Sequence, residues 1–379
     1  MTRSSDGGSL RPVGRERLDE TSGKLVRVRA HLTEAGLDGV LLSRRNNFAW
    51  LTAGGDNHVA AATEDGAAAL LVTHDAVRVI ATNIEMPRLL DEELSGLDVS
   101  PVVVPWHEDE YRARSAAVGK MRVASDTPLP GVPQLGIEFA RLRFALFPSE
   151  AARYRRIGQR AADAVEDVAR EARPGESETL LAGSLSRALM ARGLTPTVLL
   201  VACDERIRRY RHPVPTGTRL KQQALLVVMA MAGGLQVAIS RLIHFGPLPA
   251  DLSRRHRAVV AIDAALAVAS RPGVKARDAL GSGIAAYRRE GFPDEWRLHH
   301  QGGPTGYATR EYLATPACAE VLLENQPMAW NPSITGTKSE DTFILTAAGP
   351  EYVTLSDRWP DHEIPVDGGV IRRPAILER

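Results

Sequence analysis

Apolar residues recur with helical spacing, and then with strand spacing, over the first third of the chain. Leu25, Val28 and Leu32 share one face of a helix predicted over residues 16–35, which Gly36 can end. Four apolar runs then predict strands at 40–42, 67–72, 77–81 and 99–104, the second and third as a hairpin, and 85–93 is predicted to be helical. This alternation of helix and strand predicts an α/β domain.

The rest of the chain places helices before paired strands. Ser149 is predicted to cap a long helix that runs through Ala172 and is ended by Pro174-Gly175. Further helices are predicted at 180–192, 254–270 and 276–289, and strands at 198–203, 225–232, 235–239 and 341–346. The pattern predicts an α+β domain. We therefore expect a disordered tail at 1–14 and two domains, at 15–145 and 146–379.

Composition narrows the class of protein. Hydrophobic residues make up 44% of the 379 residues and charged residues 25%, as in soluble globular proteins. The net charge of +1 gives no bulk attraction for nucleic acid or an anionic membrane. Residues 1–14 are polar and contain no apolar run, so we expect neither a signal peptide nor a membrane span there. Cys203 and Cys318 have neither metal-ligand spacing nor a disulfide framework, which favours the cytoplasm.

Short polar motifs lie near the predicted strand ends of the second domain. His212 follows an arginine-rich run that ends Tyr210-Arg211, and Ser240-Arg241 ends a strand. Toward the C-terminus come the motifs His299-His300-Gln301-Gly302-Gly303, Asn331-Pro332 and Glu340-Asp341. A histidine suits proton transfer near neutral pH, and the planar fork of arginine suits a carboxylate. Each has a structural alternative, because single histidines usually pack and arginine runs are usually solvated.

In this order the motifs resemble the catalytic domain of the creatinase, prolidase and aminopeptidase P family, the pita-bread fold. With the first domain they resemble the two-domain branch of that family, over roughly residues 16–358. The resemblance implies a creatinase-type α/β N-terminal domain followed by an α+β pita-bread domain. It also implies a homodimer, in which the loop around Arg45 and Asn47 reaches the partner's active site; a surface turn is the alternative for that loop.

The resemblance aligns five positions with metal ligands, and only His300 and Glu340 keep a ligand there. Met229 offers a thioether that suits soft metals, Ala238 offers nothing, and Asn331 is neutral. Two divalent cations need several carboxylates to offset their charge. We therefore expect no metal and no cofactor.

The function that the resemblance then implies is a metal-independent, creatinase-like enzyme acting on a small carboxylate-bearing substrate. Creatinase cleaves a C–N bond without metal and uses a histidine as proton shuttle. We expect His212 as the acid/base, with His300 and Glu340 orienting water or substrate; whether His299 or His300 faces the site stays open. The residues expected to bind the substrate are Arg45, Asn47, Tyr210, Arg211, Arg241, Tyr307, Arg310 and Asn331.

Three other functions stay open. A lyase or isomerase step would use the same proton transfer. A metallopeptidase resembling Xaa-Pro aminopeptidase or prolidase is possible in this fold, although the missing ligands count against it. A catalytically inactive peptide-binding protein, as in a histone chaperone subunit that shares the fold, is the third.

Overall fold

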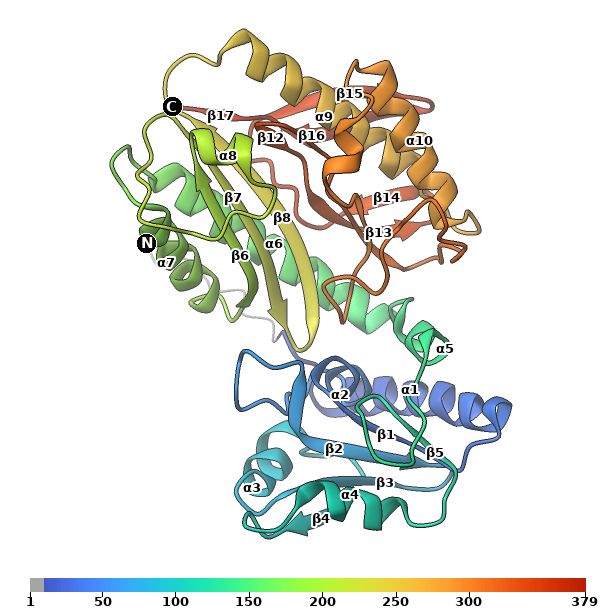
Figure 1. Ribbon diagram of the computed structural model, residues 1–379. Helices are drawn as coiled ribbons and strands as arrows, with labels where there is room; N and C mark the ends of the chain where they lie inside the picture. The colour runs from blue at the N-terminus through green and yellow to red at the C-terminus, as the bar shows by residue number, and fades with distance from the viewer. Residues whose placement is uncertain (1–9) are drawn as a thin grey trace. The chain divides into compact units, whose positions relative to one another are not determined.

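A computed structural model describes residues 10–379 (Figure 1). Most of the predicted disordered tail, residues 1–9, lies outside the described residues. The chain forms two compact units. The first runs to Arg143 and includes Gly233–Leu235, and the second comprises Phe144–Ala232 and Gln236–Arg379.

The first unit is built on a five-stranded sheet in the order β4-β3-β2-β1-β5. Its strands are β1 (Gly39–Arg44), β2 (Asp65–Thr73), β3 (Val77–Thr82), β4 (Ser100–Val104) and β5 (Val123–Ser125). The central pairs are antiparallel and the two outer pairs are parallel, so the predicted hairpin is confirmed. The helices are α1 (Gly14–Ala35), α2 (Arg45–Leu51), α3 (Met86–Arg88) with a π-helical turn (Leu89–Glu93), α4 (Glu110–Val118), and α5 (Ile137–Ala140) with a 3-10 turn (Arg141–Arg143).

The second unit contains two four-stranded sheets and two small ribbons. One sheet has the order β17-β8-β7-β6, from β6 (Thr195–Cys203), β7 (Gln223–Ala232), β8 (Leu235–His244) and β17 (Leu377–Glu378). The other has the order β14-β13-β10-β9, from β9 (Gly302–Pro304), β10 (Pro327–Trp330), β13 (Asp341–Thr346) and β14 (Gly349–Tyr352). The ribbons pair β11 (Ser333–Ile334) with β12 (Thr337–Lys338), and β15 (Asp361–Val366) with β16 (Gly369–Pro374).

Helices cover these sheets. They are α6 (Pro148–Glu171), α7 (Glu178–Met190), α8 (Glu205–Arg209), α9 (Ala250–Ala269), α10 (Ala276–Arg289) and a 3-10 turn (Glu295–Leu298). In Figure 1, α6 and α7 run beside the sheet of β6–β8, and α9 and α10 lie beside the C-terminal strands. Apolar side chains of α9 and α10 form a core there, together with Met328, Trp330 and Phe343. The predicted α+β architecture is confirmed.

The start of α6 corrects one sequence prediction. The helix begins at Pro148, whose fixed φ suits the first helical position and whose missing N–H costs nothing there. The N–H of Phe147 donates to Glu150 Oε2 at 2.8 Å. Ser149 therefore lies inside the first turn and is not the cap. The preference of proline for the first helical position outweighs the preference of serine for the capping position.

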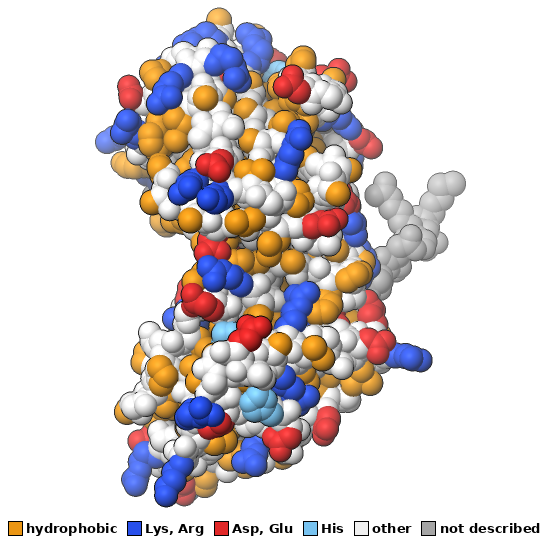
Figure 2. Space-filling model, turned by 90° about the vertical axis from the view of Figure 1, so that its right-hand side faces the viewer, with side chains coloured by type: hydrophobic (Ala, Val, Ile, Leu, Met, Phe, Trp, Pro, Cys, Tyr) orange, Lys and Arg blue, Asp and Glu red, His pale blue; other side chains and the backbone are white. Residues whose placement is uncertain are grey.

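Charged side chains of both signs are interspersed on the face shown in Figure 2, in keeping with the net charge of +1. Within residues 10–379 no helix combines the length and apolarity needed to cross a bilayer. Neither observation points to a charged or apolar surface that would dominate binding.

A buried ion network holds the second unit together. We use this name for Arg241, Arg373, Asp263, Asp341 and Glu166. Arg373 Nη2 lies 2.5 Å from Asp263 Oδ2 and 2.9 Å from Asp341 Oδ2, and Arg241 Nη1 lies 3.0 Å from Asp341 Oδ1. Both guanidinium groups are fully buried. Arg241 also lies under the ring of Trp359, 5.6 Å from its centroid.

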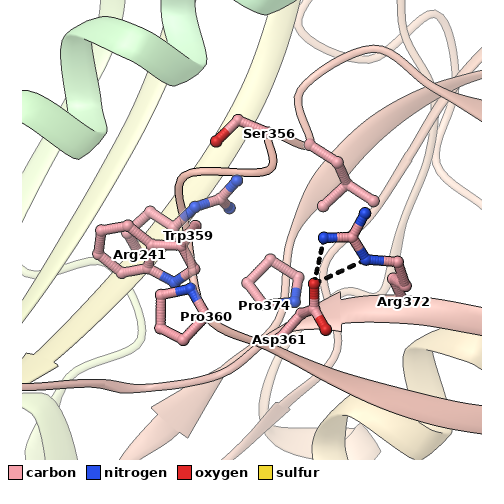
Figure 3. Close-up of a pocket in the computed structure, with 8 residues that line it drawn as sticks. Arg241, Ser356, Trp359, Pro360, Asp361, Arg372 and Pro374 are labelled. Atoms are coloured by element: carbon pink, nitrogen blue, oxygen red, sulfur yellow. Dashed lines mark hydrogen bonds and ion pairs between the residues drawn. The ribbon is translucent and has the colours of Figure 1, made fainter.

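Figure 3 shows the small hollow beside this network, lined by Arg241, Ser356, Trp359 and the Asp361–Arg372 ion pair. Its volume of about 10 Å³ leaves room for about one water molecule. The hollow is therefore a packing defect, and it is too small for a substrate.

Replacing Arg373 by Met should destabilise the protein by about 3–5 kcal/mol, because two buried carboxylates lose their shared partner. The neighbouring Arg372 is half exposed on its own ion pairs, so Arg372→Met should cost less than about 1 kcal/mol. Urea unfolding of both variants measures the difference. An equal loss of unfolding free energy in the two variants would show that the buried network contributes no more to stability than a surface ion pair.

Candidate functional site

Two dipeptides join the two sheets of the second unit. Ser240-Arg241 of β8 lies beside Glu340-Asp341, at the start of β13. Ser240 N donates to Glu340 O at 3.0 Å and Ser240 Oγ donates to Glu340 Oε2 at 2.7 Å. Successive side chains of a strand alternate in direction. Ser240 and Glu340 therefore share one side of this junction, while Arg241 and Asp341 enter the buried ion network on the other.

The Glu340 carboxylate is held between two protein cations, a group that we call the cation clamp. Lys338 Nζ lies 2.8 Å from Oε2, and Arg310 Nη2 lies 3.1 Å from Oε1. All three side chains are largely buried. Burial alone would raise the pKa of Glu340, but Lys338 and Arg310 outweigh it and lower the pKa to about 2. The clamp thus carries two positive charges and one negative charge, a surplus of +1.

An apolar cluster occupies the positions that the resemblance aligned with metal ligands. Met229 and Ala238 pack with Ala329 of β10 and with the partly buried Val198. Arg310 Nη1 lies 3.9 Å from Met229 Sδ, so the cation clamp borders this cluster. On β10, Trp330 pairs with Asp341, and Asn331 follows directly after this pair.

Three imidazoles gather nearby and form the histidine cluster: His212, His299 and His300. One ring nitrogen from each lies within 4.8 Å of the others. His212 Nε2 and His299 Nε2 are 3.0 Å apart, and the rings of His299 and His300 stack with centroids 4.4 Å apart. His212 lies in the loop after α8.

The histidine cluster is neutral at pH 7. Burial, followed by the charge of Lys338, lowers the pKa of His299 to about 2. Burial and the charge of Arg310 lower the pKa of His300 to about 4. The pKa of His212 is also lowered, chiefly by burial and then by Lys338. A neutral imidazole has one nitrogen with a lone pair and one with an N–H. The lone pair can accept a proton, and the N–H can donate a hydrogen bond that orients the ring.

Gly302 links the histidine cluster to Asn331. Its N–H donates to His300 Nδ1 at 3.3 Å. Its φ is +88°, and an added Cβ would lie 2.3 Å from Ala329 O and 3.0 Å from Asn331 Oδ1. Only glycine fits here. Asn331 is buried, and its Oδ1 has no hydrogen-bond partner among residues 10–379.

Several residues expected to bind substrate have other partners. Arg211 donates to Glu295 Oε2 at 2.5 Å and to the hydroxyls of Ser333 and Thr335. Arg241 belongs to the buried ion network.

Tyr307 is also held inside the protein, where its hydroxyl donates to Glu150 Oε1 at 2.6 Å. All three side chains thus have partners within the protein, and their assignment to substrate binding stays a prediction. Tyr210 is exposed, with Arg206 and Arg209 over its ring.

The two candidates in the first unit are held within that unit. Asn47 Nδ2 donates to Asp126 Oδ2 at 2.9 Å, and Asn47 Oδ1 accepts from Arg143 at 2.8 Å. This amide is therefore buried and paired within the first unit, and its role at a partner's site stays a prediction. Arg45 donates to the carbonyls of Ala61 and Thr63. The homodimer itself stays a prediction.

Sequence reasoning missed Lys338 and Ser240, and it left the choice between His299 and His300 open. Lys338 could have been noticed because it is one of only five lysines in an arginine-rich chain and stands two residues before Glu340. Nothing in the sequence signals that Ser240 Oγ reaches the Glu340 carboxylate. The structure brings together His212, His300, Glu340, Arg310 and Asn331 of the expected set.

Comparison with known proteins places this geometry in a family. Residues 152–347, just over half of the chain, match the family model of metallopeptidase family M24. The chain belongs to metallopeptidase family M24. Residues 24–173 match the creatinase/prolidase N-terminal domain.

Solved structures with the same fold have different roles. The Xaa-Pro dipeptidase from Bacillus anthracis superposes with a TM-score of 0.75 at 17% identity, over 95% of this chain and 100% of that one. The N-terminal domain of the FACT complex subunit SPT16 from Cicer arietinum superposes with a TM-score of 0.69 at 13% identity, over 89% and 96%. At these identities the likeness shows the fold alone.

One curated relative has a different kind of name. Agropine synthesis cyclase from Rhizobium rhizogenes is 26% identical over 153 residues, which is 37% of this chain and 38% of the cyclase. The match therefore spans well under half of the cyclase. It shows that similarity extends to a protein named for ring closure and not for peptide hydrolysis.

The residues present do not fit the metal centre that the family name implies. Both oxygens of Glu340 already bind Lys338, Arg310 and Ser240, and the aligned positions at Met229 and Ala238 are apolar. The histidine cluster offers three ring nitrogens within 4.8 Å of one another, but it supplies no negative charge, and the surplus positive charge of the clamp opposes a dication.

Protein purified without chelator should therefore contain no stoichiometric Mn, Co or Zn, and a chelator should not change its melting temperature. The reason is that a dication would meet a site of like charge with one committed carboxylate. Elemental analysis together with thermal unfolding measures both. One or two equivalents of metal, lost with a drop in melting temperature, would contradict the expectation.

Proposed function

We propose that this M24 protein is a metal-independent enzyme that hydrolyses a C–N bond in a small carboxylate-bearing substrate, with His212 as the acid/base. The observation that carries the proposal is the pairing of His212 with His299 beside a clamp whose net charge is +1. An anion entering a largely buried site of net positive charge is attracted without needing a metal.

The contact between His212 and His299 supports one arrangement of the proton on His212. His299, with a pKa of about 2, stays neutral and can accept the His212 Nε2–H. His212 Nδ1 then presents its lone pair to a water or to a substrate N–H. In the hydrolysis, Nδ1 takes a proton from the attacking water and returns it to the departing nitrogen. His299 is the positioning group in this scheme.

Glu340 takes a different role from the one expected. Its two oxygens are engaged by Lys338, Arg310 and Ser240, so it is poorly placed to orient water. We assign it the task of fixing both cations beside the reacting bond. Arg310 remains a candidate for the substrate carboxylate, as the sequence suggested, and Lys338 joins it.

A second candidate function is intramolecular ring closure, which the similarity to agropine synthesis cyclase favours. Ring closure needs a base to activate the attacking group and an acid to protonate the leaving group. The His212–His299 pair could serve both steps. Analysis of products by mass separates the two: hydrolysis adds one water to the substrate, and ring closure by condensation removes one.

His212→Ala should lower turnover of the substrate about 10²–10⁴-fold while the melting temperature is retained, because a positioned acid/base is lost from a solvent-facing loop. The exposed His107 of the first unit provides the matched control, and His107→Ala should keep full activity. A panel of N-substituted amino acids, followed by mass spectrometry, supplies the substrate. Near-full activity of His212→Ala would assign the proton transfer elsewhere.

Activity should fall on the acid side of pH 6.5 and be level above it. The pKa of His212 lies below its ordinary 6.5, so the base is free at pH 7 and becomes protonated only as pH falls. Glu340, with a pKa of about 2, stays ionised over this pH range and causes no change in activity near neutral pH. The pH dependence of kcat/KM tests this. An inflection above pH 7 would be incompatible with His212 as the base.

A further inference from the structure

The loop that carries His212 has few contacts of its own to hold it. After α8 the chain has no regular secondary structure over residues 210–218. Residues 211–213 make no backbone–backbone hydrogen bond within the described part of the chain, and Pro213 has no N–H to donate. The placement of the His212 ring therefore depends on side-chain contacts, and the side chain next to it in sequence is that of Arg211.

Arg211 ties this loop to two other segments. Its Nη2 donates to Glu295 Oε2 at 2.5 Å and to Thr335 Oγ1 at 3.0 Å, and its Nη1 donates to Ser333 Oγ at 3.2 Å. Thr335 in turn donates to Glu295 Oε2 from its N–H at 3.0 Å and from its hydroxyl at 3.1 Å. We call these four residues the histidine brace. The side chains of Arg211 and Glu295 are less than one-fifth exposed, so salt screens their attraction less than that of a surface pair.

The other end of the brace leads to His299. Glu295 begins the 3-10 turn that ends directly before His299. The Gln301 amide nitrogen donates to the carbonyl oxygens of Trp296 and His299, at 3.2 and 2.6 Å, and the Gln301 amide oxygen accepts from the Tyr287 hydroxyl at 2.9 Å. This turn is thus held to α10 by buried side chains, and it gives Arg211 a fixed partner.

We propose that the histidine brace positions His212 against His299 and so holds the His212 imidazole in a single tautomer. The inference rests on the proposed function, in which His212 presents one particular nitrogen for proton transfer. A neutral imidazole can carry its proton on either nitrogen, and the contact between the two Nε2 atoms selects one choice only while they stay at 3.0 Å. Arg211 and Glu295 are then positioning residues, since they act through His212.

The ring nitrogens of His212 report the tautomer directly. Full-length protein labelled with nitrogen-15 in its histidines is studied by proton–nitrogen correlation spectra, and His212→Gln identifies the His212 signals. At pH 7.5, where His212 is neutral, the wild-type protein should show one protonated and one bare ring nitrogen with well-separated shifts. Arg211→Met and Glu295→Gln should both move these shifts toward the average of the two tautomers.

Matched variants separate the brace from a general effect of charge. Arg209 and Asp294 are exposed, and each stands close in sequence to the brace residue of the same charge. Arg209→Met and Asp294→Asn should leave the His212 shifts unchanged. Arg211→Lys keeps a cation near Glu295 and should stay closer to the wild-type shifts than Arg211→Met.

Two results would overturn the brace: averaged His212 shifts in the wild-type protein, or unchanged shifts in both Arg211→Met and Glu295→Gln. If Arg211→Met does not fold, Thr335→Val makes the comparison, because it removes a hydroxyl that both charged side chains contact.

Kinetics separate positioning from substrate binding. Once a substrate is known, Glu295→Gln should lower kcat by up to about 10²-fold with little change in KM, as a small displacement of a reacting group does. A raised KM with an unchanged kcat would assign the ion pair to substrate binding and overturn the positioning role. The proposed function fails separately. If the His212 shifts respond to the brace variants while His212→Ala keeps its turnover, the proposed chemistry fails and the brace stands.

Discussion

The contact between Ser240-Arg241 and Glu340-Asp341 is the constraint on which the second unit depends. It joins the two sheets by a backbone hydrogen bond and by side chains on both sides. One side of the contact is the buried ion network, and the other is the cation clamp. The position of Glu340 is therefore set by the same residues that hold the core.

Two of the positions that the resemblance aligned with metal ligands are packed without a buried charge. In the M24 fold of this chain, Met229 and Ala238 pack into an apolar cluster with Ala329, so no uncompensated charge is left there. Lys338 and Arg310 supply the positive charge that keeps Glu340 ionised. The charge balance of the site is thus internal to the protein, and it favours a small anion over a dication.

The sequence predicted the fold well because periodicity and order are local signals. The hairpin at β2 and β3, the long helices and the motif order were all readable, since each depends on a few neighbouring residues. Pairing between distant residues was not readable. Asn47, Arg211 and Tyr307 looked like candidates for binding, but their partners Asp126, Glu295 and Glu150 lie far away in sequence. Lys338 was missed for the same reason.

The apolar cluster has a consequence for how such a site can change over generations. A single substitution that restored a carboxylate at Met229 or Ala238 would bury a charge among Val198 and Ala329, and it would cost stability before it could hold an ion. Two or three acids would have to arrive together, and the neighbouring cations would have to leave. A single acidic substitution in the apolar cluster is therefore expected to lower the stability of the second unit without creating a place for an ion.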